Sequence, residues 1–169
     1  MKRFLSILLT FFLIFSFFGC KSNTIEEPVS FYYLRKNITF NAEDSVIGYE
    51  IADGSQFTHV SKMLAAYLKG PKDQNLTSPF PAGTYLLNTE KIDDLLIVTL
   101  SDNFAALTGI SLSIACCALT KTIVEYTGVE AVEIQTVFGL LDGEKSVIIY
   151  ADDIVLYDSY ETTSTEPIQ

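Results

Sequence analysis

The chain has 169 residues, of which 21 are Asp or Glu and 11 are Lys or Arg, so its formal net charge at pH 7 is −10. This acidity argues against binding to nucleic acid phosphates or anionic lipid through a basic surface, because such binding depends on clustered Lys and Arg. Apolar residue types make up 49% of the chain, enough for one domain with a real hydrophobic core.

The N-terminal residues have the layout of a secretory signal peptide. Lys and Arg follow the initial Met, and an uncharged apolar run at residues 4–18 ends at Gly19 and Cys20. As a helix this run spans only about 22 Å, whereas a membrane core is about 30 Å thick. The junction resembles the lipobox of bacterial lipoproteins, which predicts a lipoprotein signal peptide at residues 1–19, cleavage between Gly19 and Cys20, and lipidation of Cys20. An ordinary signal peptide or an uncleaved anchor, with Cys20 incidental, is the alternative.

We expect the lipid on Cys20 to anchor the mature protein to the extracytoplasmic face of the cell membrane, since two or more acyl chains make a firm anchor. Residues 20–28 comprise the lipidated cysteine and a polar tether, and the part after Cys20 reaches at most about 28 Å when extended. A domain at residues 29–158 follows, and a polar tail at residues 159–169 is predicted to be disordered.

The other two cysteines, Cys116 and Cys117, are adjacent within an apolar helical pattern. A disulfide between neighbours would be strained, and neither residue has the spaced partners of a zinc site. We interpret both as buried core thiols.

The first half of the domain contains two predicted strands followed by a helix. β-branched and aromatic residues indicate the strands, and apolar residues at three- and four-residue steps indicate the helix. Asp53 and Gln56 have the spacing of a capping box, and Gly70-Pro71 ends the helix. The elements are predicted at residues 29–34, 45–52 and 56–69.

In the second half, a loop at residues 71–84 leads to a hairpin that turns at Asp93-Asp94. Its second strand is a nearly unbroken apolar run, which predicts a strand inside the sheet with both faces covered. The four strands of this half are predicted at residues 85–92, 95–100, 131–139 and 146–157, and a helix at residues 111–126. The buried face of that helix is predicted to consist of Leu112, Ala115, Cys116, Leu119, Ile123 and Tyr126, with Gly128 beyond its end. This order predicts an α+β fold, with two helices packed on one face of a mixed or mainly antiparallel sheet.

Four blocks of the sequence resemble the successive blocks of the GerMN domain. They are YLKGP, SPFPAGTYLL, LIVTLSDNF and ALTKTIVEYTGVEAVEI, which begin at Tyr67, Ser78, Leu96 and Ala118. The resemblance covers residues 30–139 and depends on the order and spacing of the blocks. GerMN domains occur in sporulation and germination proteins and in other bacterial envelope lipoproteins. The resemblance implies an α+β domain akin to the ring-building modules of secretion-like assemblies, acting by protein contact without catalysis. The C-terminal strands lie outside it.

The sequence offers few candidates for a catalytic, cofactor or metal site, and we assign none. His59, the only histidine, has no nucleophile motif to accompany it, so we expect it to face solvent. The pairs Asp93-Asp94 and Asp152-Asp153 fall at turns or strand edges without a calcium-loop motif, which favours solvated carboxylates. The chain is therefore predicted not to be an enzyme.

Two groups of aromatic residues are candidates for a binding surface. Phe31, Tyr32 and Tyr33 are consecutive in a predicted strand, so at least one is expected to point away from the core, and Phe80 lies between two prolines in a loop. Exposed aromatic side chains are common at interfaces. The alternative is a strand covered on both faces.

These observations predict a non-enzymatic, lipid-anchored envelope protein whose domain binds another envelope protein, and the resemblance implies a link to sporulation or germination. The alternative is an extracytoplasmic lipoprotein that binds a small ligand or a cell-wall fragment, which requires a pocket with converging polar groups. An envelope hydrolase ranks last, because it requires clustered titratable residues around a cleft. No nucleic acid partner is expected, and the oligomeric state stays open.

Overall fold

A computed structural model describes residues 28–36, 46–140 and 143–154 of the chain. The predicted signal peptide at residues 1–19, the lipidated Cys20 with most of its tether, and the predicted tail at residues 159–169 lie outside the described residues. These interpretations therefore stay predictions.

The described residues form strands, two α-helices and three short 3₁₀ helices. The strands are β1 (Val29–Arg35), β2 (Ile47–Ala52), β3 (Leu76–Thr77), β4 (Leu86–Ile92), β5 (Leu95–Leu100), β6 (Ala131–Thr136) and β7 (Ser146–Tyr150). The helices are α2 (Val60–Tyr67), α3 (Gly109–Thr127), η1 (Gly54–Gln56), η2 (Asp102–Ala106) and η3 (Ala151–Asp153). Sheet A has three strands in the order β2-β1-β3, and sheet B has four in the order β4-β5-β6-β7. Only the pairing of β5 with β6 is parallel.

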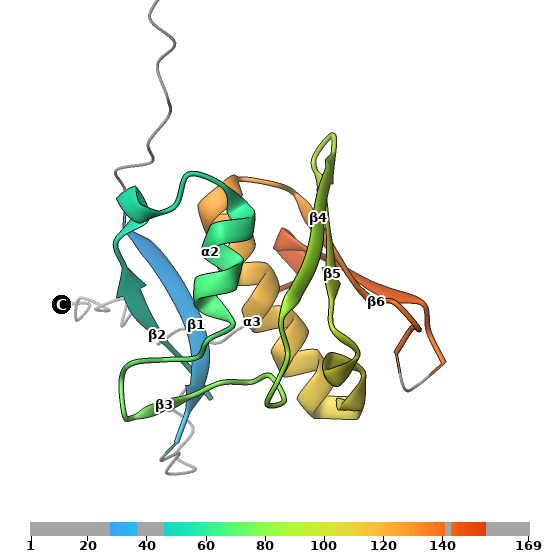
Figure 1. The fold of residues 1–169 in the computed structure, drawn as a ribbon, viewed down its shortest axis with the longest axis horizontal. Helices are drawn as coiled ribbons and strands as arrows, with labels where there is room; N and C mark the ends of the chain where they lie inside the picture. Colours follow the sequence, from blue (N-terminus) through green and yellow to red (C-terminus); the bar gives the residue numbers. More distant parts are fainter. Residues whose placement is uncertain (1–27, 37–45, 141–142, 155–169) are drawn as a thin grey trace, which may run out of the picture.

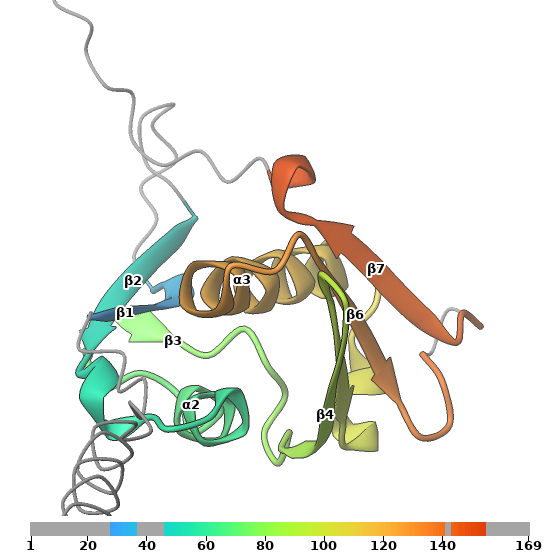
Figure 2. The ribbon, with the colours of Figure 1, turned by 90° about the horizontal axis from the view of Figure 1, so that it is seen from above.

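Helix α3 lies between the two sheets, and α2 packs beside it on the same side of sheet B (Figures 1 and 2). The inner faces of both sheets and the apolar faces of both helices share one core. The predicted α+β class is confirmed, although the strands divide between two sheets where the sequence suggested one. The division follows from α3, which connects β5 to β6 on one side and packs against β1 on the other.

Helix α3 is apolar on more than one side. Its buried residues include the predicted Leu112, Ala115, Cys116, Leu119 and Ile123, and also Ala118, Thr120 and Thr122. By length and composition alone, it is the one helix among the described residues that could cross a membrane. A helix covered by a sheet on each side needs apolar residues all round, and this position accounts for the composition. The helix ends at Gly128, as predicted, in the left-handed conformation with a φ of 70°.

The predicted helix at residues 56–69 is shorter in the structure and is preceded by the separate turn η1. The Asp53 carboxylate accepts hydrogen bonds from the backbone N of Ser55 (3.0 Å) and from Nε2 of Gln56 (3.1 Å). These bonds cap η1, not α2. Phe57 is extended, with φ −108° and ψ 105°, and this conformation interrupts the helix before α2 begins.

The expectation that an aromatic side chain of β1 is exposed is wrong, because Phe31, Tyr32 and Tyr33 are all buried. Phe31 and Tyr33 face α2, and their ring centroids lie 5.3 Å and 5.0 Å from that of Tyr67. Tyr32 points to the other face, where Nζ of Lys121 in α3 lies 4.7 Å from its ring centroid. The alternative, a strand covered on both faces, is confirmed.

Phe80 is also buried, so its expected exposure in the loop is wrong. Its ring lies between those of Tyr67 and Phe104, with centroid distances of 5.3 Å and 6.3 Å. The segment around it is irregular, as predicted, but its side chain fills the core beside α2. The prolines on each side hold the backbone in a loop and do not decide where the ring points.

The hairpin of β4 and β5 turns at Asp93 and Asp94, as predicted. Strand β5 lies inside sheet B, between β4 and β6. Its second face is not covered as predicted: Leu96, Val98 and Leu100 are buried, whereas the alternate residues are half-buried. The predicted strand at residues 146–157 is shorter in the structure, since β7 ends at Tyr150 and η3 follows.

Candidate functional site

The structure describes some of the residues that the sequence analysis considered and not others. Gly19 and Cys20 lie outside the described residues. His59 is exposed at the N-terminal end of α2, as expected, and its side chain makes no capping hydrogen bond.

The two aspartate pairs are exposed, and the first of them forms a backbone turn. Asp93 adopts a positive φ of 53° at the hairpin turn. The carbonyl oxygen of Asp94 accepts hydrogen bonds from the backbone N of Glu130 (2.9 Å) and of Ala131 (3.2 Å), which positions the start of β6. Asp152 and Asp153 lie in η3 and are exposed. Within the described ranges, no cluster of three or more His, Cys, Asp or Glu side chains could hold a metal ion.

The two adjacent thiols differ in their surroundings. Cys116 is buried in the core, whereas Cys117, one residue on, is half-buried. Burial raises the pKa of the Cys117 thiol, which disfavours the reactive thiolate. The prediction of two buried core thiols holds for Cys116 and in part for Cys117.

The outer face of sheet B is left uncovered by the two α-helices of the described residues. Both α2 and α3 lie on the opposite face of this sheet (Figure 2). The strand register places outward-facing side chains in three rows across the sheet. The first row is Ile92, Leu95, Ala131 and Tyr150, the second is Glu90, Ile97, Glu133 and Ile148, and the third is Asn88, Thr99, Gln135 and Ser146.

These rows grade from apolar to polar. The first row is apolar throughout. Its outermost members, Ile92 and Tyr150, are 48% and 56% exposed, whereas Leu95 is half-buried and Ala131 is buried. The second row alternates carboxylates with apolar side chains, and Ile148 is 49% exposed. The third row is polar throughout, with a hydrogen bond from Nε2 of Gln135 to Oγ1 of Thr99 (3.1 Å). The outer face of sheet B is therefore apolar at one end and acidic in the middle, where Glu90 and Glu133 lie. None of the three rows contains Lys or Arg.

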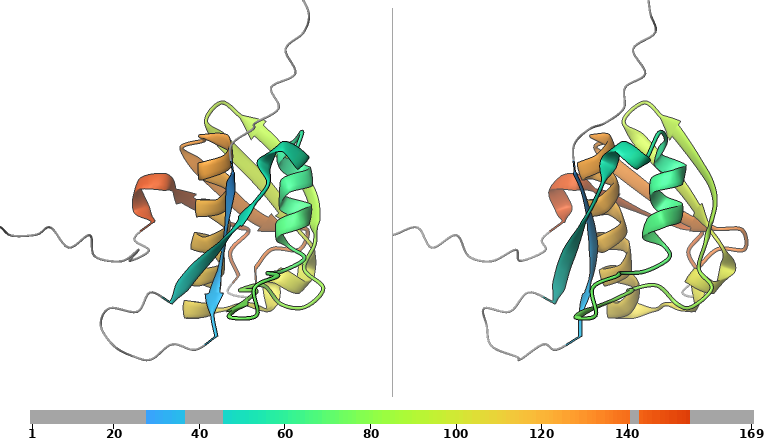
Figure 3. Two further views of the ribbon diagram at one scale, coloured as in Figure 1. Left: turned by 90° about the vertical axis from the view of Figure 1, so that its left-hand side faces the viewer. Right: turned by 60° about the vertical axis from the view of Figure 1, so that its left-hand side comes forward.

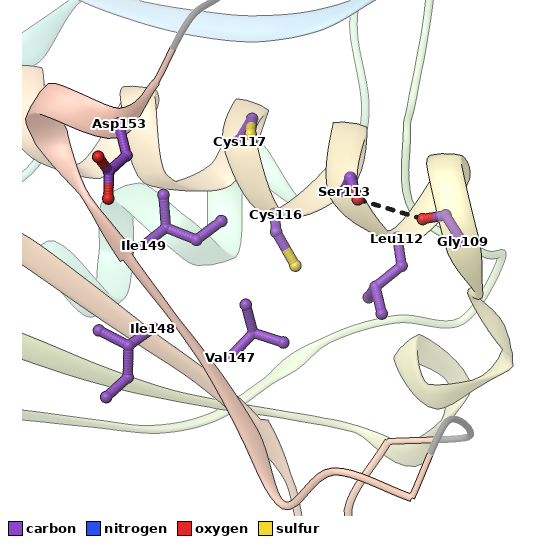
Figure 4. A pocket seen from close by; sticks show the side chains of 9 residues that line it. All are labelled: Gly109, Leu112, Ser113, Cys116, Cys117, Val147, Ile148, Ile149 and Asp153. Atoms are coloured by element: carbon purple, nitrogen blue, oxygen red, sulfur yellow. Dashed lines mark hydrogen bonds between the residues drawn. The ribbon is translucent and has the colours of Figure 1, made fainter.

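A cavity of about 420 Å³ lies between α3 and β7 (Figure 4). Leu112, Cys116, Val147 and Ile149 line it with apolar groups, and the carboxylate of Asp153 lies at one end. Ser113 also lines it, but its hydroxyl already donates to the carbonyl oxygen of Gly109 (3.3 Å). Its volume is in the range of small-molecule sites, yet among the described residues Asp153 is the only carboxylate that lines it.

Sequence analysis missed the outer face of sheet B. The alternation of Ile148 and Tyr150 with inward-facing Val147 and Ile149 is visible in the sequence and predicts one exposed apolar face for β7. That this face continues across β6 to Leu95 depends on the parallel pairing of β5 with β6, which no local pattern specifies. The sequence pattern could therefore predict the exposed face of β7, but not the surface that β4, β5, β6 and β7 form together.

Comparison with known proteins identifies a family and similar structures. The family model described as "Germane: Sporulation and spore germination" matches residues 30–139. The first GerMN domain of the sporulation protein GerM from Bacillus subtilis is 13% identical, with a TM-score of 0.49, and the match covers 70% of this chain and 85% of that one. The tandem GerMN domains of the same protein are 21% identical, with a TM-score of 0.48, over 77% of this chain and 47% of that one.

A third similar structure is named "Putative Lipoprotein from Clostridium perfringens". It is 17% identical, with a TM-score of 0.45, and the match covers 80% of this chain and 94% of that one. No curated protein matches the chain.

Proposed function

The chain belongs to the Germane family of sporulation and spore germination proteins, and we propose that it is a non-enzymatic envelope lipoprotein that binds another protein through the outer face of sheet B. The single observation that carries this proposal is the row Ile92, Leu95, Ala131 and Tyr150, which is apolar across all four strands and uncovered by either helix. An apolar surface of this kind, rimmed by polar residues, is typical of a protein interaction site.

The charge of the surface indicates the chemistry of its partner. Glu90 and Glu133 lie in the row next to the apolar one, and no Lys or Arg side chain faces outward on these strands. The whole chain carries a formal charge of −10, so a second copy would bring like charges together. The fitting partner is a different protein that presents an apolar patch bordered by Lys or Arg.

The predicted anchor limits where this partner is found. Lipid on Cys20 leaves a tether of at most about 28 Å before β1 begins. The partner therefore lies at or near the extracytoplasmic face of the cell membrane, where the lipid is inserted. Retention of the native protein in the membrane fraction and its loss from that fraction in a Cys20→Ala variant tests this part of the proposal.

Site-specific photocrosslinking in the native cell tests the docking surface. A photoreactive side chain is introduced at Ile148 or, as a control, at Ile110, which is 80% exposed in the first turn of α3. We expect a single product from position 148 that position 110 does not give, and we expect Glu90→Lys to remove it. Equal products from both positions, or a product that survives Glu90→Lys, contradict the proposed surface.

The identified partner then allows a quantitative test. We expect Ile148→Lys to raise the dissociation constant at least about tenfold, which corresponds to about 1.4 kcal/mol, while Ile110→Lys leaves it unchanged. Affinity should also fall as salt is raised, because charged contacts at the rim are screened. Unchanged affinity in Ile148→Lys would remove sheet B from the interface.

The cavity in Figure 4 favours a second function, the capture of a small ligand with an apolar body and a cationic or hydrogen-bond-donating group. Asp153 is placed to pair with that group, and Leu112 and Val147 with the apolar body. Native mass spectrometry of the purified protein, compared with a Val147→Phe variant that fills the cavity, separates the two functions. Ligand capture is favoured if the wild-type protein carries a bound small molecule, the Val147→Phe variant does not, and photocrosslinking yields no protein partner.

A further inference from the structure

Strand β2 forms one edge of sheet A, and it lies at the periphery of the domain beside β1 (Figure 3). In the part of the chain that the structure describes, no strand pairs with its other edge. The side chains of Tyr49 and Ile51 on this strand are 56% and 59% exposed. Around Tyr49 and Ile51, the strand thus combines an edge that no described strand pairs with exposed apolar side chains.

The register shows which backbone groups of β2 point outward. The backbone N of Tyr32 donates to Oγ1 of Thr122 (3.1 Å), and the carbonyl oxygen of Tyr32 accepts from the hydroxyl of Tyr67. Tyr32 is therefore turned away from β2, and its partner Tyr49 is turned away from β1. Since these groups alternate along a strand, the N–H and C=O of Ile51 also point outward.

Two other strand edges among the described residues, those of β1 and β4, carry features that hinder an added strand. The free edge of β1 is occupied by Thr122 and Tyr67, as described. Strand β4 has a register shift between Leu86 and Asn88, followed by the charged Glu90 and Lys91. Strand β2 pairs with β1 without any shift and contains neither Lys nor Pro. The edge therefore has no register shift, Lys or Pro to hinder strand addition, and the carboxylate of its one charged residue, Glu50, is bonded to the backbone N of Lys72 and Asp73.

Two hollows border β2 on its inner side. One, of about 410 Å³, is lined by Gly48 and Tyr49 of β2 and by the polar side chains of Arg35, Asp73 and Asn75. The Glu50 carboxylate accepts hydrogen bonds from the backbone N of Lys72 (2.9 Å) and Asp73 (3.2 Å), which ties the loop beneath the strand.

The other hollow, of about 720 Å³, is lined by Ile51 and Ala52 of β2 and also by Phe31, Phe57 and Ala66. Polar and charged residues also line this hollow, namely Glu50, Asp53, Gln56, Lys69 and Lys72. Alternate side chains of an added strand lie about 6.6 Å apart. The same two-residue step separates Tyr49, which lines the first hollow, from Ile51, which lines the second.

From this arrangement we propose that β2 is a binding site for an extended peptide segment of another protein, which adds to sheet A as a further strand. The outward N–H and C=O groups of Tyr49 and Ile51 supply main-chain hydrogen bonds, and the hollows select side chains. The segment carries a polar side chain for the hollow beside Asn75 and an apolar one, two residues away, for the hollow beside Phe57. This site is separate from the outer face of sheet B and does not depend on it.

A library of random linear heptapeptides, selected on the full-length mature protein, tests the proposal. We expect enrichment of proline-free peptides in which polar and apolar residues stand two positions apart. In a synthetic copy of such a peptide, N-methylation of alternate amides on one edge should weaken binding at least tenfold, and methylation on the other edge should not. Equal effects on both edges, or enrichment of peptides without this pattern, would overturn strand addition.

Variants of the protein locate the site. Tyr49→Pro removes an N–H that points away from β1, which an edge strand tolerates, and we expect at least a tenfold loss of peptide binding. Tyr49→Phe retains the N–H and should bind as the wild type does. Ile148→Lys, on the outer face of sheet B, should also bind normally, so the two surfaces are tested separately. Full peptide binding by Tyr49→Pro would show that the peptide binds elsewhere. A dimer of the wild-type protein that Tyr49→Pro abolishes would show that the edge binds a second copy of this chain and would also overturn the proposal.

Discussion

The hydroxyl of Tyr67 in α2 donates a hydrogen bond to the backbone carbonyl oxygen of Tyr32 in β1. In return, the hydroxyl of Tyr33, the next residue of β1, donates to the carbonyl oxygen of Tyr67 at 2.8 Å. The helix and the strand thus satisfy each other's backbone groups in the core. The edge of β1 is closed by side chains where another strand would otherwise be needed.

Loss of the Tyr67 hydroxyl is therefore expected to destabilise the domain. Tyr67→Phe keeps the ring but leaves the buried carbonyl oxygen of Tyr32 without this donor, which costs about 1–3 kcal/mol. Urea unfolding measures the change. Tyr85→Phe is the control, since Tyr85 is 58% exposed and its change should stay within about 0.5 kcal/mol. Equal effects of the two variants would show that the buried bond contributes nothing.

The same tyrosines predict a loss of stability at alkaline pH. Burial raises the pKa of Tyr33, with a smaller contribution from Glu50, and burial also raises the pKa of Tyr67. In the unfolded chain both ionise near pH 10, so the stabilising difference is complete below that pH and is lost above it. The free energy of unfolding should fall by about 1.4 kcal/mol per pH unit for each tyrosine.

Urea unfolding between pH 8 and pH 11, as round working limits about the tyrosine pKa, measures this slope. The Tyr33→Phe variant should show a shallower decline, because one ionisable phenol has been removed from both states. A wild-type stability that stays constant across this range would contradict the assigned burial of both hydroxyls.

Two phenylalanines in irregular segments should respond very differently to truncation. Phe80 is 7% exposed and packs between Tyr67 and Phe104, whereas Phe138 is 87% exposed. We expect Phe80→Ala to cost about 3–5 kcal/mol, the range for a buried phenylalanine. Phe138→Ala should change stability by less than about 0.5 kcal/mol. Thermal or urea unfolding of both variants checks the contrast, and similar midpoints would refute the buried position of Phe80.

Thiol reactivity reports both the core and the predicted anchor. In the folded native protein, half-buried Cys117 should react slowly with a small thiol reagent, because burial raises its pKa, and buried Cys116 should react only on unfolding. The sequence has three cysteines. If Cys20 carries its lipid, the unfolded mature protein should therefore titrate only the Cys116 and Cys117 thiols. A further reacting thiol would disprove the thioether at Cys20.

Local sequence patterns predicted the elements better than their assembly. Apolar residues at three- and four-residue steps predicted a helix at residues 56–69, and three of them, Met63, Leu64 and Tyr67, are the buried residues of α2, because helical periodicity is a local property. The long extent of α3 and its glycine cap were predicted for the same reason. The predicted start of the helix at residues 56–69 was wrong because Phe57, between η1 and α2, has an extended backbone that interrupts the helix.

The binding surfaces were beyond the sequence because they depend on pairing between distant segments. Phe80 was correctly placed in a loop, but its burial depends on Phe104, which no local pattern joins to it. The outer face of sheet B depends on the register that sets Leu95 opposite Ala131. Which backbone groups of β2 point outward depends on the backbone of its partner Tyr32, whose N–H bonds to Thr122 in α3. In each case tertiary contacts decide which of two possible faces is exposed.

The parallel pairing of β5 with β6 also sets an order of assembly for the nascent chain. The hairpin of β4 and β5 closes over a tight turn, so its ends meet at little entropic cost. Strand β6 can join only after the crossover through η2 and α3 has been made. Until then β5 presents an apolar, unpaired edge. A mutation that slows the formation of α3 should therefore raise aggregation during refolding more than its effect on equilibrium stability would suggest.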